Sequence, residues 1–278
     1  MYLTVSDQAA YAYTGGRPLA GSKPPVVFIH GAQHDHSVWI LQSRYLAHHG
    51  SPVVALDLPG HGRSSGPALR SVEDMADWVA GVLRHLNLGP ALLCGHSMGS
   101  LVALQCAATH PALAAGIALV GSAAPMKVSD TLLAAARDDE PRALDMINSW
   151  SHASINGRPG CPGPGFSIFV QNRRLMERQP RGTLLTDFSA CNAYQGAFEA
   201  ATRLRCPALF ILGSRDMMTP PKAARGLIQA ITESSATAGG RGPEVVEVPG
   251  CGHALMSERP DAVLEALTAF LKRLSPAN

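Results

Sequence analysis

The sequence predicts an α/β protein in which a mostly parallel β-sheet is covered by helices on both faces. Short apolar runs alternate with longer segments of helical periodicity, which is typical of parallel strands joined by crossover helices. The alternation is interrupted once, between residues 123 and 203, by helical patterns without a strand. Because 278 residues can bury a full core, we expect one domain that carries an insertion.

Six apolar runs are the predicted strands of this sheet. Five are continuous, as expected for strands buried on both faces: PVVFIH (25–30), PVVALDL (52–58), ALLCGH (91–96), GIALVGS (116–122) and PALFILG (207–213). The sixth, EVVEV (244–248), alternates and indicates an edge strand, preceded by a flexible surface loop at 232–243. Residues up to about Gly16 are expected to form an antiparallel hairpin on the opposite edge.

Helical periodicity fills the segments between the strands. Residues 71–87 begin with Ser71 and Asp74 in a capping-box-like arrangement, which favours a helix start. Apolar residues recur at helical spacing through this segment, and the same periodicity covers 98–109 and 260–274. We therefore expect helices at these three places.

The interrupted stretch predicts an inserted helical cap. Two helical patterns and a loop between them make it up: residues 129–150, 167–200 and 156–165. Because the stretch directly follows a predicted strand, we expect it to project from the sheet rather than to form a separate domain. The predicted division is a core of residues 1–122 and 204–278 and a cap of residues 123–203.

Composition and charge exclude several classes of function. Hydrophobic residues make up 46% and charged residues 16%, as in an ordinary globular protein. The net charge of +2 and the absence of a basic stripe with interleaved aromatics predict no nucleic-acid partner. The sequence has no run of membrane-spanning length, no signal-peptide pattern and no CxxC pair among six cysteines. We expect a cytoplasmic monomer or homodimer that contacts no membrane.

The strongest chemical signal is the motif Gly95-His96-Ser97-Met98-Gly99, a G-x-S-x-G. It lies directly after a predicted strand and directly before a predicted helix, the context in which this motif carries a nucleophile. A turn this tight leaves no room for side chains at its two glycines and exposes the serine hydroxyl. Ser97 is therefore the predicted nucleophile.

A serine at its ordinary pKa needs a base within hydrogen-bond reach. Among eleven histidines, His253 is the best candidate because it lies in a glycine-rich loop between the last strand and the last helix. His30 and His96 stand at strand ends, where packing or a backbone hydrogen bond is expected. For His34 and His36 a place at the mouth of the site is one alternative, and a solvated loop is the one we expect.

The base in turn needs a carboxylate that fixes its tautomer. Asp216 follows the strand 207–213, and the order Ser97, Asp216, His253 is the one expected for this architecture. Asp57 also follows a strand, but it precedes the serine and is interpreted as a turn-building residue. The segment just after 116–122 offers no carboxylate, which favours Asp216.

A tetrahedral intermediate needs two donors directed at its oxyanion. Gly31 permits a sharp turn after the strand 25–30, which lets the Ala32 N–H point inward. The Met98 N–H, at a helix N-terminus beside the nucleophile, is the second predicted donor. The Gln33 side chain either assists or faces solvent.

These residues together resemble the α/β-hydrolase superfamily. The resemblance lies in HGA (30–32), DLPGHGRS (57–64), GHSMGS (95–100), LGSRD (212–216) and GCGH (250–253). It covers about 26–122 and 205–274, and it is similar to the lidded esterases, lactonases and carbon–carbon bond hydrolases. It implies a mostly parallel eight-stranded sheet flanked by helices, a helical cap, and catalysis without metal or cofactor. One departure is Ser100, where many relatives carry glycine, and it is expected to be tolerated.

The cap, which selects the substrate in such proteins, matches the family in position only. Candidate substrate contacts are Trp150, Asn192 and Tyr194 of the cap, with Gln33 near the predicted oxyanion donors. Helix packing accounts for most of the other cap aromatics. Exposed arginines of the cap would attract an acidic substrate, but a solvated helix face explains them as well.

Two functions of different class remain open on the sequence. The first is a serine hydrolase acting on a small carboxylic ester or lactone, with a thioester or a carbon–carbon bond beside a ketone as alternatives. The second is a ligand receptor that retains the fold with little turnover. The intact triad and oxyanion loop favour the hydrolase over the receptor. The triad residues do not choose among the four bonds, because the same acyl chemistry serves all of them.

Overall fold

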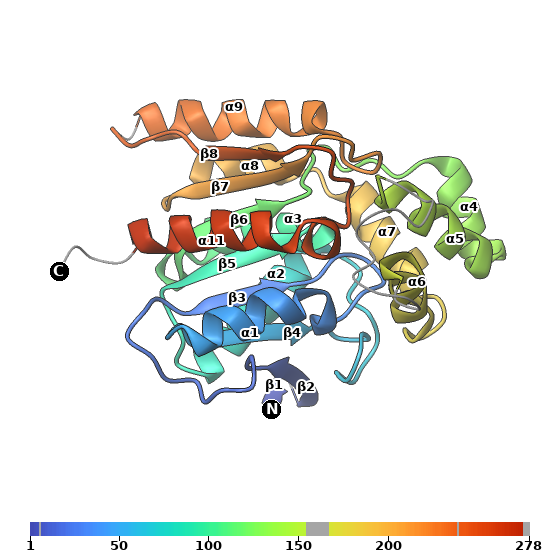
Figure 1. Cartoon of the computed structure of the whole chain (residues 1–278), viewed down its shortest axis with the longest axis horizontal. Helices are drawn as coiled ribbons and strands as arrows, with labels where there is room; N and C mark the ends of the chain where they lie inside the picture. The colour runs from blue at the N-terminus through green and yellow to red at the C-terminus, as the bar shows by residue number, and fades with distance from the viewer. Residues whose placement is uncertain (6, 154–166, 238, 275–278) are drawn as a thin grey trace.

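The computed structural model describes residues 1–5, 7–153, 167–237 and 239–274. Its centre is an open eight-stranded sheet in the order β1-β2-β4-β3-β5-β6-β7-β8 (Figure 1). The strands are β1 (Tyr2–Val5), β2 (Gln8–Tyr13), β3 (Val26–Ile29), β4 (Val53–Asp57), β5 (Ala91–His96), β6 (Ala114–Val120), β7 (Ala208–Gly213) and β8 (Glu244–Val248). β1 and β2 pair antiparallel and the remaining strands run parallel. The predicted fold class, the hairpin and the edge strand are confirmed.

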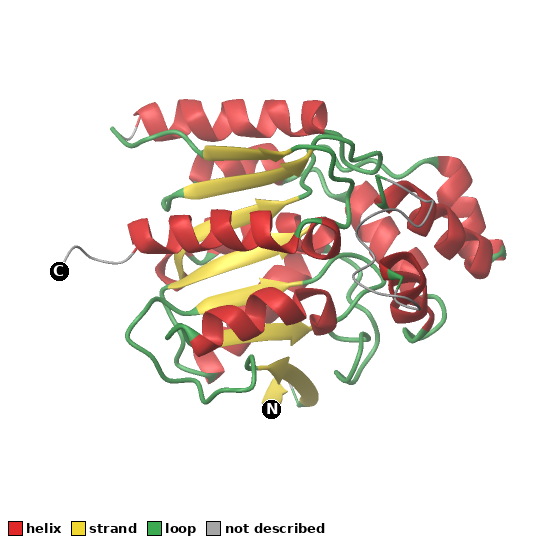
Figure 2. Cartoon of the chain, in the orientation of Figure 1, coloured by secondary structure: helices red, strands yellow, loops and turns green. Residues whose placement is uncertain are grey.

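Helices cover both faces of this sheet, as Figure 2 shows. One face carries α1 (Ile40–His48), α10 (Leu255–Glu258) and α11 (Pro260–Leu274). The other carries α2 (Val72–His85), α3 (Met98–Thr109), α8 (Ala197–Arg203) and α9 (Pro221–Thr237). Short 3-10 turns η1 (His36–Trp39) and η2 (Pro111–Leu113) complete the connections. Of the predicted surface loop 232–243, the part up to Thr237 is wrong, because α9 continues to that residue.

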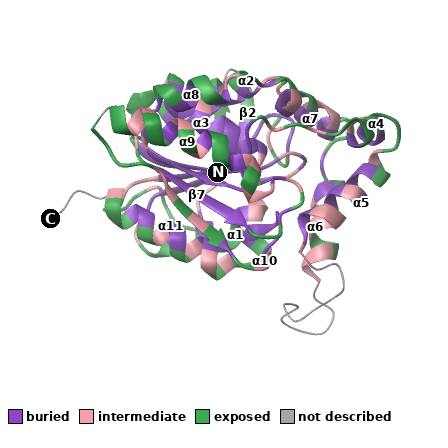
Figure 3. Ribbon diagram, turned by 90° about the horizontal axis from the view of Figure 1, so that it is seen from above, coloured by how far each residue is buried: buried purple, intermediate pink, exposed green. Residues whose placement is uncertain are grey.

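Alternation along the strands explains why five runs are continuously apolar. On β5, Leu93 enters the hydrophobic cluster beneath α2 and α3, whereas Leu92 and Cys94 enter the cluster beneath α1 and α11. Buried residues therefore occupy both faces of the sheet (Figure 3). Since successive side chains point to opposite faces, a strand covered on both sides needs apolar residues at every position.

A group of helices projects beyond the carboxyl ends of the parallel strands (Figure 1). They are α4 (Asp130–Asp138), α5 (Glu140–Ser151), α6 (Ile168–Glu177) and α7 (Thr183–Ala193). The pattern predicted as one helix over 129–150 divides at Asp139, whose side chain accepts the Arg142 N–H and caps α5. Pro141 lacks an N–H and suits the first turn of a new helix. These helices share a hydrophobic cluster of their own.

The pattern predicted over 167–200 divides into α6, α7 and α8. Ala197, Ala200 and Ala201 of α8 are buried in the cluster of the sheet, beside α3 and α9. By packing, α8 thus belongs to the layer over the sheet, although it lies within the stretch predicted as cap. The loop predicted at 156–165 lies outside the described residues. The division into core and cap stays a prediction.

Candidate active site

Ser97 occupies a strained turn between β5 and α3. Its backbone has φ 52° and ψ −119°, in a region that non-glycine residues rarely adopt. A Cβ on Gly95 would collide with the Gly99 carbonyl, and one on Gly99 would collide with the Ile29 carbonyl. The turn therefore requires both glycines, and the Ser97 N–H is held by the Val120 carbonyl at 2.9 Å.

The side chain of Ser97 is partly exposed, whereas its immediate neighbours in the chain are buried. Within the described part of the chain its hydroxyl forms no hydrogen bond. Ser97 lines a cavity of about 300 Å³ together with Ala32 and Trp150. The turn thus presents a free hydroxyl to a cavity, which is the arrangement that a nucleophile needs.

Asp216 and His253 meet at the same end of the sheet. Asp216 follows β7, His253 follows β8, and the Asp216 Oδ2 lies 2.7 Å from the His253 Nδ1. Both side chains are buried. The other carboxylate oxygen, Oδ1, accepts the N–H groups of Met218 at 2.8 Å and Thr219 at 2.7 Å. The Thr219 hydroxyl lies 2.8 Å from Oδ2 and 3.0 Å from the histidine Nδ1.

These contacts keep the carboxylate ionised. Burial alone would raise the pKa of Asp216, but the facing His253 ring and the hydrogen bonds from His253 and Thr219 outweigh it. The resulting pKa is about 2, below the ordinary 3.8. The sequence analysis did not single out Thr219. The available signal was Asp216 itself, because an aspartate side chain in a turn commonly accepts the backbone N–H groups two or three residues further on.

The two predicted oxyanion donors lie on the loop after β3 and at the start of α3. In the residues that the structure describes, neither the Ala32 N–H nor the Met98 N–H donates to another group. The Gly31–Ala32 peptide is held from its carbonyl side, because the His30 Nδ1 lies 2.8 Å from the Gly31 oxygen. The His30 Nε2 accepts the Leu58 N–H at 3.1 Å, so the donating proton is on Nδ1. Burial lowers the pKa of His30 to about 4, and the backbone contacts expected for this residue are present.

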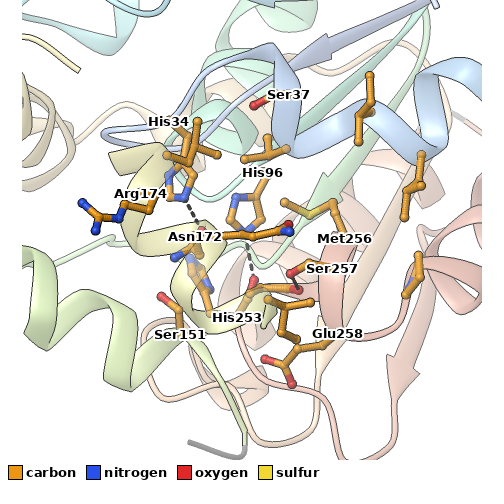
Figure 4. Close-up of a pocket in the computed structure, with 18 of the residues that line it drawn as sticks. His34, Ser37, His96, Ser151, Asn172, Arg174, His253, Met256, Ser257 and Glu258 are labelled. Carbon is orange, nitrogen blue, oxygen red and sulfur yellow. Dashed lines mark hydrogen bonds between the residues drawn. The ribbon is translucent and has the colours of Figure 1, made fainter. Parts of the chain in front are cut away.

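A second and larger cavity of about 910 Å³ opens on the other side of the site, between α6 and the core. His253 lines this cavity, and so do His34 and His96 (Figure 4). The His96 Nε2 lies 2.9 Å from the His253 carbonyl oxygen, and the two rings are 4.7 Å apart. His96 thus has the backbone contact that the sequence predicted for it.

The expectation of a solvated loop is wrong for His34. Its Nδ1 lies 2.7 Å from the Ala32 carbonyl oxygen and its Nε2 lies 2.9 Å from Asn172 Oδ1 of α6. Burial lowers the pKa of His34. His34 lies two positions after the predicted donor Ala32. No pattern in the sequence predicts that α6 covers this residue.

Of the four predicted substrate contacts, only Trp150 lines either of the two cavities. The Gln33 side chain is buried and donates to the Met176 carbonyl. Asn192 accepts the Val128 N–H, and the Tyr194 hydroxyl donates to Gln105 of α3 at 2.7 Å. These three side chains therefore contact the protein itself, because long-range packing turns their faces away from the cavities.

Asp35, His36 and Asp57 form a group whose ligand atoms lie within 4.8 Å of one another. Their atoms are already engaged: Asp57 accepts the His36 N–H, the His36 ring and the Arg63 N–H, as expected for a turn-building residue. Asp35 accepts from Ser37 and, on its other oxygen, from two side chains of the segment after α6. The group is thus a hydrogen-bond network in which both carboxylates and the His36 Nδ1 are engaged with the protein.

The arrangement matches a known family. Residues 26–266 match the model of the alpha/beta hydrolase family. The chain belongs to this family. Membership in the alpha/beta hydrolase family was expected from the motifs and is confirmed. The expectation that the chain is an enzyme of this family is supported by the same match.

Individual relatives give the range of the family. The chain is 29% identical to the pimeloyl-[acyl-carrier protein] methyl ester esterase of Chromobacterium violaceum, over 91% of this chain and 96% of the relative. It is 39% identical to the (E)-2-((N-methylformamido)methylene)succinate hydrolase of Acinetobacter baylyi over 101 residues, 36% of this chain and 38% of the relative. The fold superimposes on an enol-lactonase from Burkholderia xenovorans LB400 with a TM-score of 0.82, at 24% identity over 98% and 100% of the chains.

The chain spans between 38% and 64% of the length of the first curated relatives it matches. Over the described residues, every helix is too short or too polar to cross a membrane.

Proposed function

We propose that this protein is a serine hydrolase that cleaves small carboxylic esters or lactones through an acyl-enzyme formed on Ser97. The observation that carries the proposal is the 2.7 Å contact between Asp216 and His253, at the end of the sheet where the strained turn presents the partly exposed Ser97. A carboxylate on Nδ1 leaves Nε2 of His253 as the basic nitrogen. The Ser97 hydroxyl and this ring do not form a hydrogen bond here, and such contacts tighten when substrate binds.

The proposed mechanism uses each group once in each half-reaction. His253 takes the Ser97 proton as Oγ attacks the ester carbonyl, and the Ala32 and Met98 N–H groups stabilise the oxyanion. The intermediate collapses, and the protonated His253 gives its proton to the departing alkoxide. Water, deprotonated by the same ring, then attacks the acyl-enzyme. As this second intermediate collapses, His253 returns the proton to Ser97 Oγ and the acid is released.

Each of the two cavities accommodates a different part of the ester, one the acyl group and the other the alcohol. The cavity of about 300 Å³ adjoins Ser97 and Ala32 and is lined largely by apolar side chains such as Leu132, Trp150 and Phe188. It suits the acyl group, and its volume is at the lower end of ligand pockets. The cavity of about 910 Å³ contains His253, which delivers the proton to the leaving group. We assign it to the alcohol, so the preferred ester has a short apolar acyl group and a larger alcohol.

The relatives support ester hydrolysis, since the relative matched over nearly its full length is a methyl ester esterase. A carbon–carbon hydrolase would need polar cap groups that hold a diketone. The candidate groups are Asn192 and the arginines of the cap. Asn192 accepts the Val128 N–H, and Arg173 contacts Asp145 and Glu177. Arg174 and Arg178 line the larger cavity, but they are paired with Glu177 and Asp35. No observation therefore favours that alternative over the ester.

The test is a panel of p-nitrophenyl esters with acyl groups of two to twelve carbons, with the variant Ser97→Ala alongside. We expect turnover that is highest for short acyl groups, and a loss of at least ~10³-fold in kcat for the variant. Retained activity in Ser97→Ala contradicts the proposed nucleophile. A burst of p-nitrophenol followed by no turnover contradicts the hydrolase and supports a ligand receptor.

A further inference from the structure

The residue after the predicted oxyanion donor is held in a strained conformation. Gln33 has φ 58°, which is uncommon and strained for a residue with a side chain. Such a conformation persists only where surrounding contacts enforce it. The contacts lie on the Ala32–Gln33 peptide: the His34 ring contacts its carbonyl at 2.7 Å, and its N–H donates to Asp187 Oδ2 at 2.8 Å.

Asp187 belongs to α7, far from this loop in the chain, and it is completely buried. Its Oδ2 also lies 2.9 Å from the His61 Nε2. The His61 Nδ1 lies 3.0 Å from the Pro59 carbonyl, which only accepts. Both ring nitrogens therefore face acceptors, and this geometry requires a proton on each.

His61 and Asp187 thus form a buried ion pair, and Oδ2 of Asp187 contacts both the His61 ring and the Gln33 N–H. Burial lowers the pKa of His61, but the charge and hydrogen bond of Asp187 outweigh it, so the pKa is raised overall. The other oxygen of Asp187, Oδ1, is buried without a partner in the described structure. A buried carboxylate with an unsatisfied oxygen is costly, and such a group in a native structure calls for an explanation.

We propose that Asp187, which His61 pairs with and orients, is a positioning residue for the oxyanion hole. Its carboxylate holds the Gln33 N–H, and thereby the conformation that directs the Ala32 N–H toward the substrate carbonyl. The hole is thus completed by a helix that projects beyond the sheet, and its geometry depends on the seating of α7. This inference rests on the proposed function, since it assigns a role in the same reaction.

A neighbouring contact separates positioning from simple attachment. The Thr183 hydroxyl, also on α7, donates to the Gly60 carbonyl at 3.4 Å in the same loop as His61. It fastens α7 to the core without contacting Gln33. Thr183→Val is therefore the matched control for loss of attachment.

The test measures oxyanion binding directly, with a phenethyl trifluoromethyl ketone and the corresponding trifluoromethyl carbinol. Ser97 Oγ adds to the ketone carbonyl carbon, its proton passes to His253, and the carbonyl oxygen becomes an oxyanion. The carbinol fills the same space but has no carbonyl to attack. The ratio of the two inhibition constants therefore reports the oxyanion hole, whereas packing defects affect both ligands.

We expect wild-type protein to prefer the ketone and Asp187→Asn to lose at least ~10-fold of that preference, with kcat reduced in proportion and KM little changed. Thr183→Val should keep the wild-type ratio. An unchanged ratio in Asp187→Asn, with a lowered Tm, overturns the inference and makes Asp187 a tether only. A wild-type protein that does not prefer the ketone contradicts the proposed function itself.

A second variant keeps the test decisive if Asp187→Asn does not fold. His61→Gln keeps a neutral side-chain donor opposite Asp187 but removes the positive charge. We expect a smaller loss of ketone preference in this variant, and a wild-type ratio there likewise overturns the inference.

Discussion

Substitution of Asp216 tests how the tautomer of His253 is set. In Asp216→Asn the two N–H donors of Met218 and Thr219, at 2.8 and 2.7 Å from Oδ1, hold the amide oxygen at that position. The amide nitrogen must then take the place of Oδ2, which lies 2.7 Å from the histidine Nδ1. Because an amide nitrogen only donates, the ring is forced to carry its proton on Nε2. A ring protonated there cannot accept the proton of Ser97.

The expected loss in kcat is about 10⁴-fold, or about 5 kcal/mol of transition-state stabilisation. Asp216→Ala should lose less, although it removes more atoms. The Thr219 hydroxyl remains 3.0 Å from Nδ1 and still donates to the Gly121 carbonyl at 2.8 Å, so its oxygen accepts the Nδ1 proton. The correct tautomer survives without its counter-charge, which corresponds to roughly 10²-fold in kcat.

The assay is single-turnover acylation of wild-type protein and both variants with a p-nitrophenyl ester, alongside ¹⁵N spectra of the labelled histidine ring. We expect activity to fall in the order wild type, Asp216→Ala, Asp216→Asn, with the Nε2-protonated tautomer only in the last. Asp216→Ala exposes two unsatisfied N–H groups and should lose ~1–3 kcal/mol of stability for each, so rates are compared well below its Tm. A folded Asp216→Asn within ~10-fold of wild type would refute the reasoning.

Two further predictions concern the turn and the small cavity. Gly99→Ala places a Cβ against the backbone carbonyls of Ile29 and His30, so we expect a loss of at least ~1–3 kcal/mol in unfolding experiments and ~10²-fold in kcat. Gly81→Ala, where the new Cβ meets only Val5 at 3.5 Å, is the control and should be stable and active. Trp150→Ala enlarges the acyl cavity, and the ratio of kcat/KM for decanoyl over butyryl esters should rise at least ~10-fold; an unchanged ratio contradicts the assignment of that cavity.

The fold was predictable because the relevant signals are local. A strand buried on both faces needs a continuous apolar run. Five such runs, and the alternating run predicted as an edge strand, coincide with strands within about two residues. The turn at Ser97 was predictable for the same reason, since two glycines separated by three residues satisfy a steric requirement within one turn. The meeting of Asp216 and His253 followed from the rule that carboxyl ends of parallel strands share one edge.

The cap residues were not predictable in this way. The helix α7 contains Asp187 and Asn192 and ends at Tyr194. No pattern in the sequence indicates which of these three side chains faces the site. Its hydrophobic periodicity is weak because α7 contacts the core on one side and the other cap helices on another. The side chain that reaches the site loop is Asp187, whereas the two that were predicted to contact substrate bond to Val128 and Gln105.

Substitutions of cap residues should have two different effects, depending on whether the side chain lines the small cavity or contacts the loop after β3. Leu132 and Trp150 line the small cavity, which we assigned to the acyl group, so their substitution should change which ester is preferred. Asp187 contacts the loop that carries an oxyanion donor, and that donor acts on every ester alike. Its substitution should therefore lower kcat for all acyl chains by the same factor. The substrate panel separates the two kinds of residue, because a change in preference and a uniform loss of rate have different patterns across chain length.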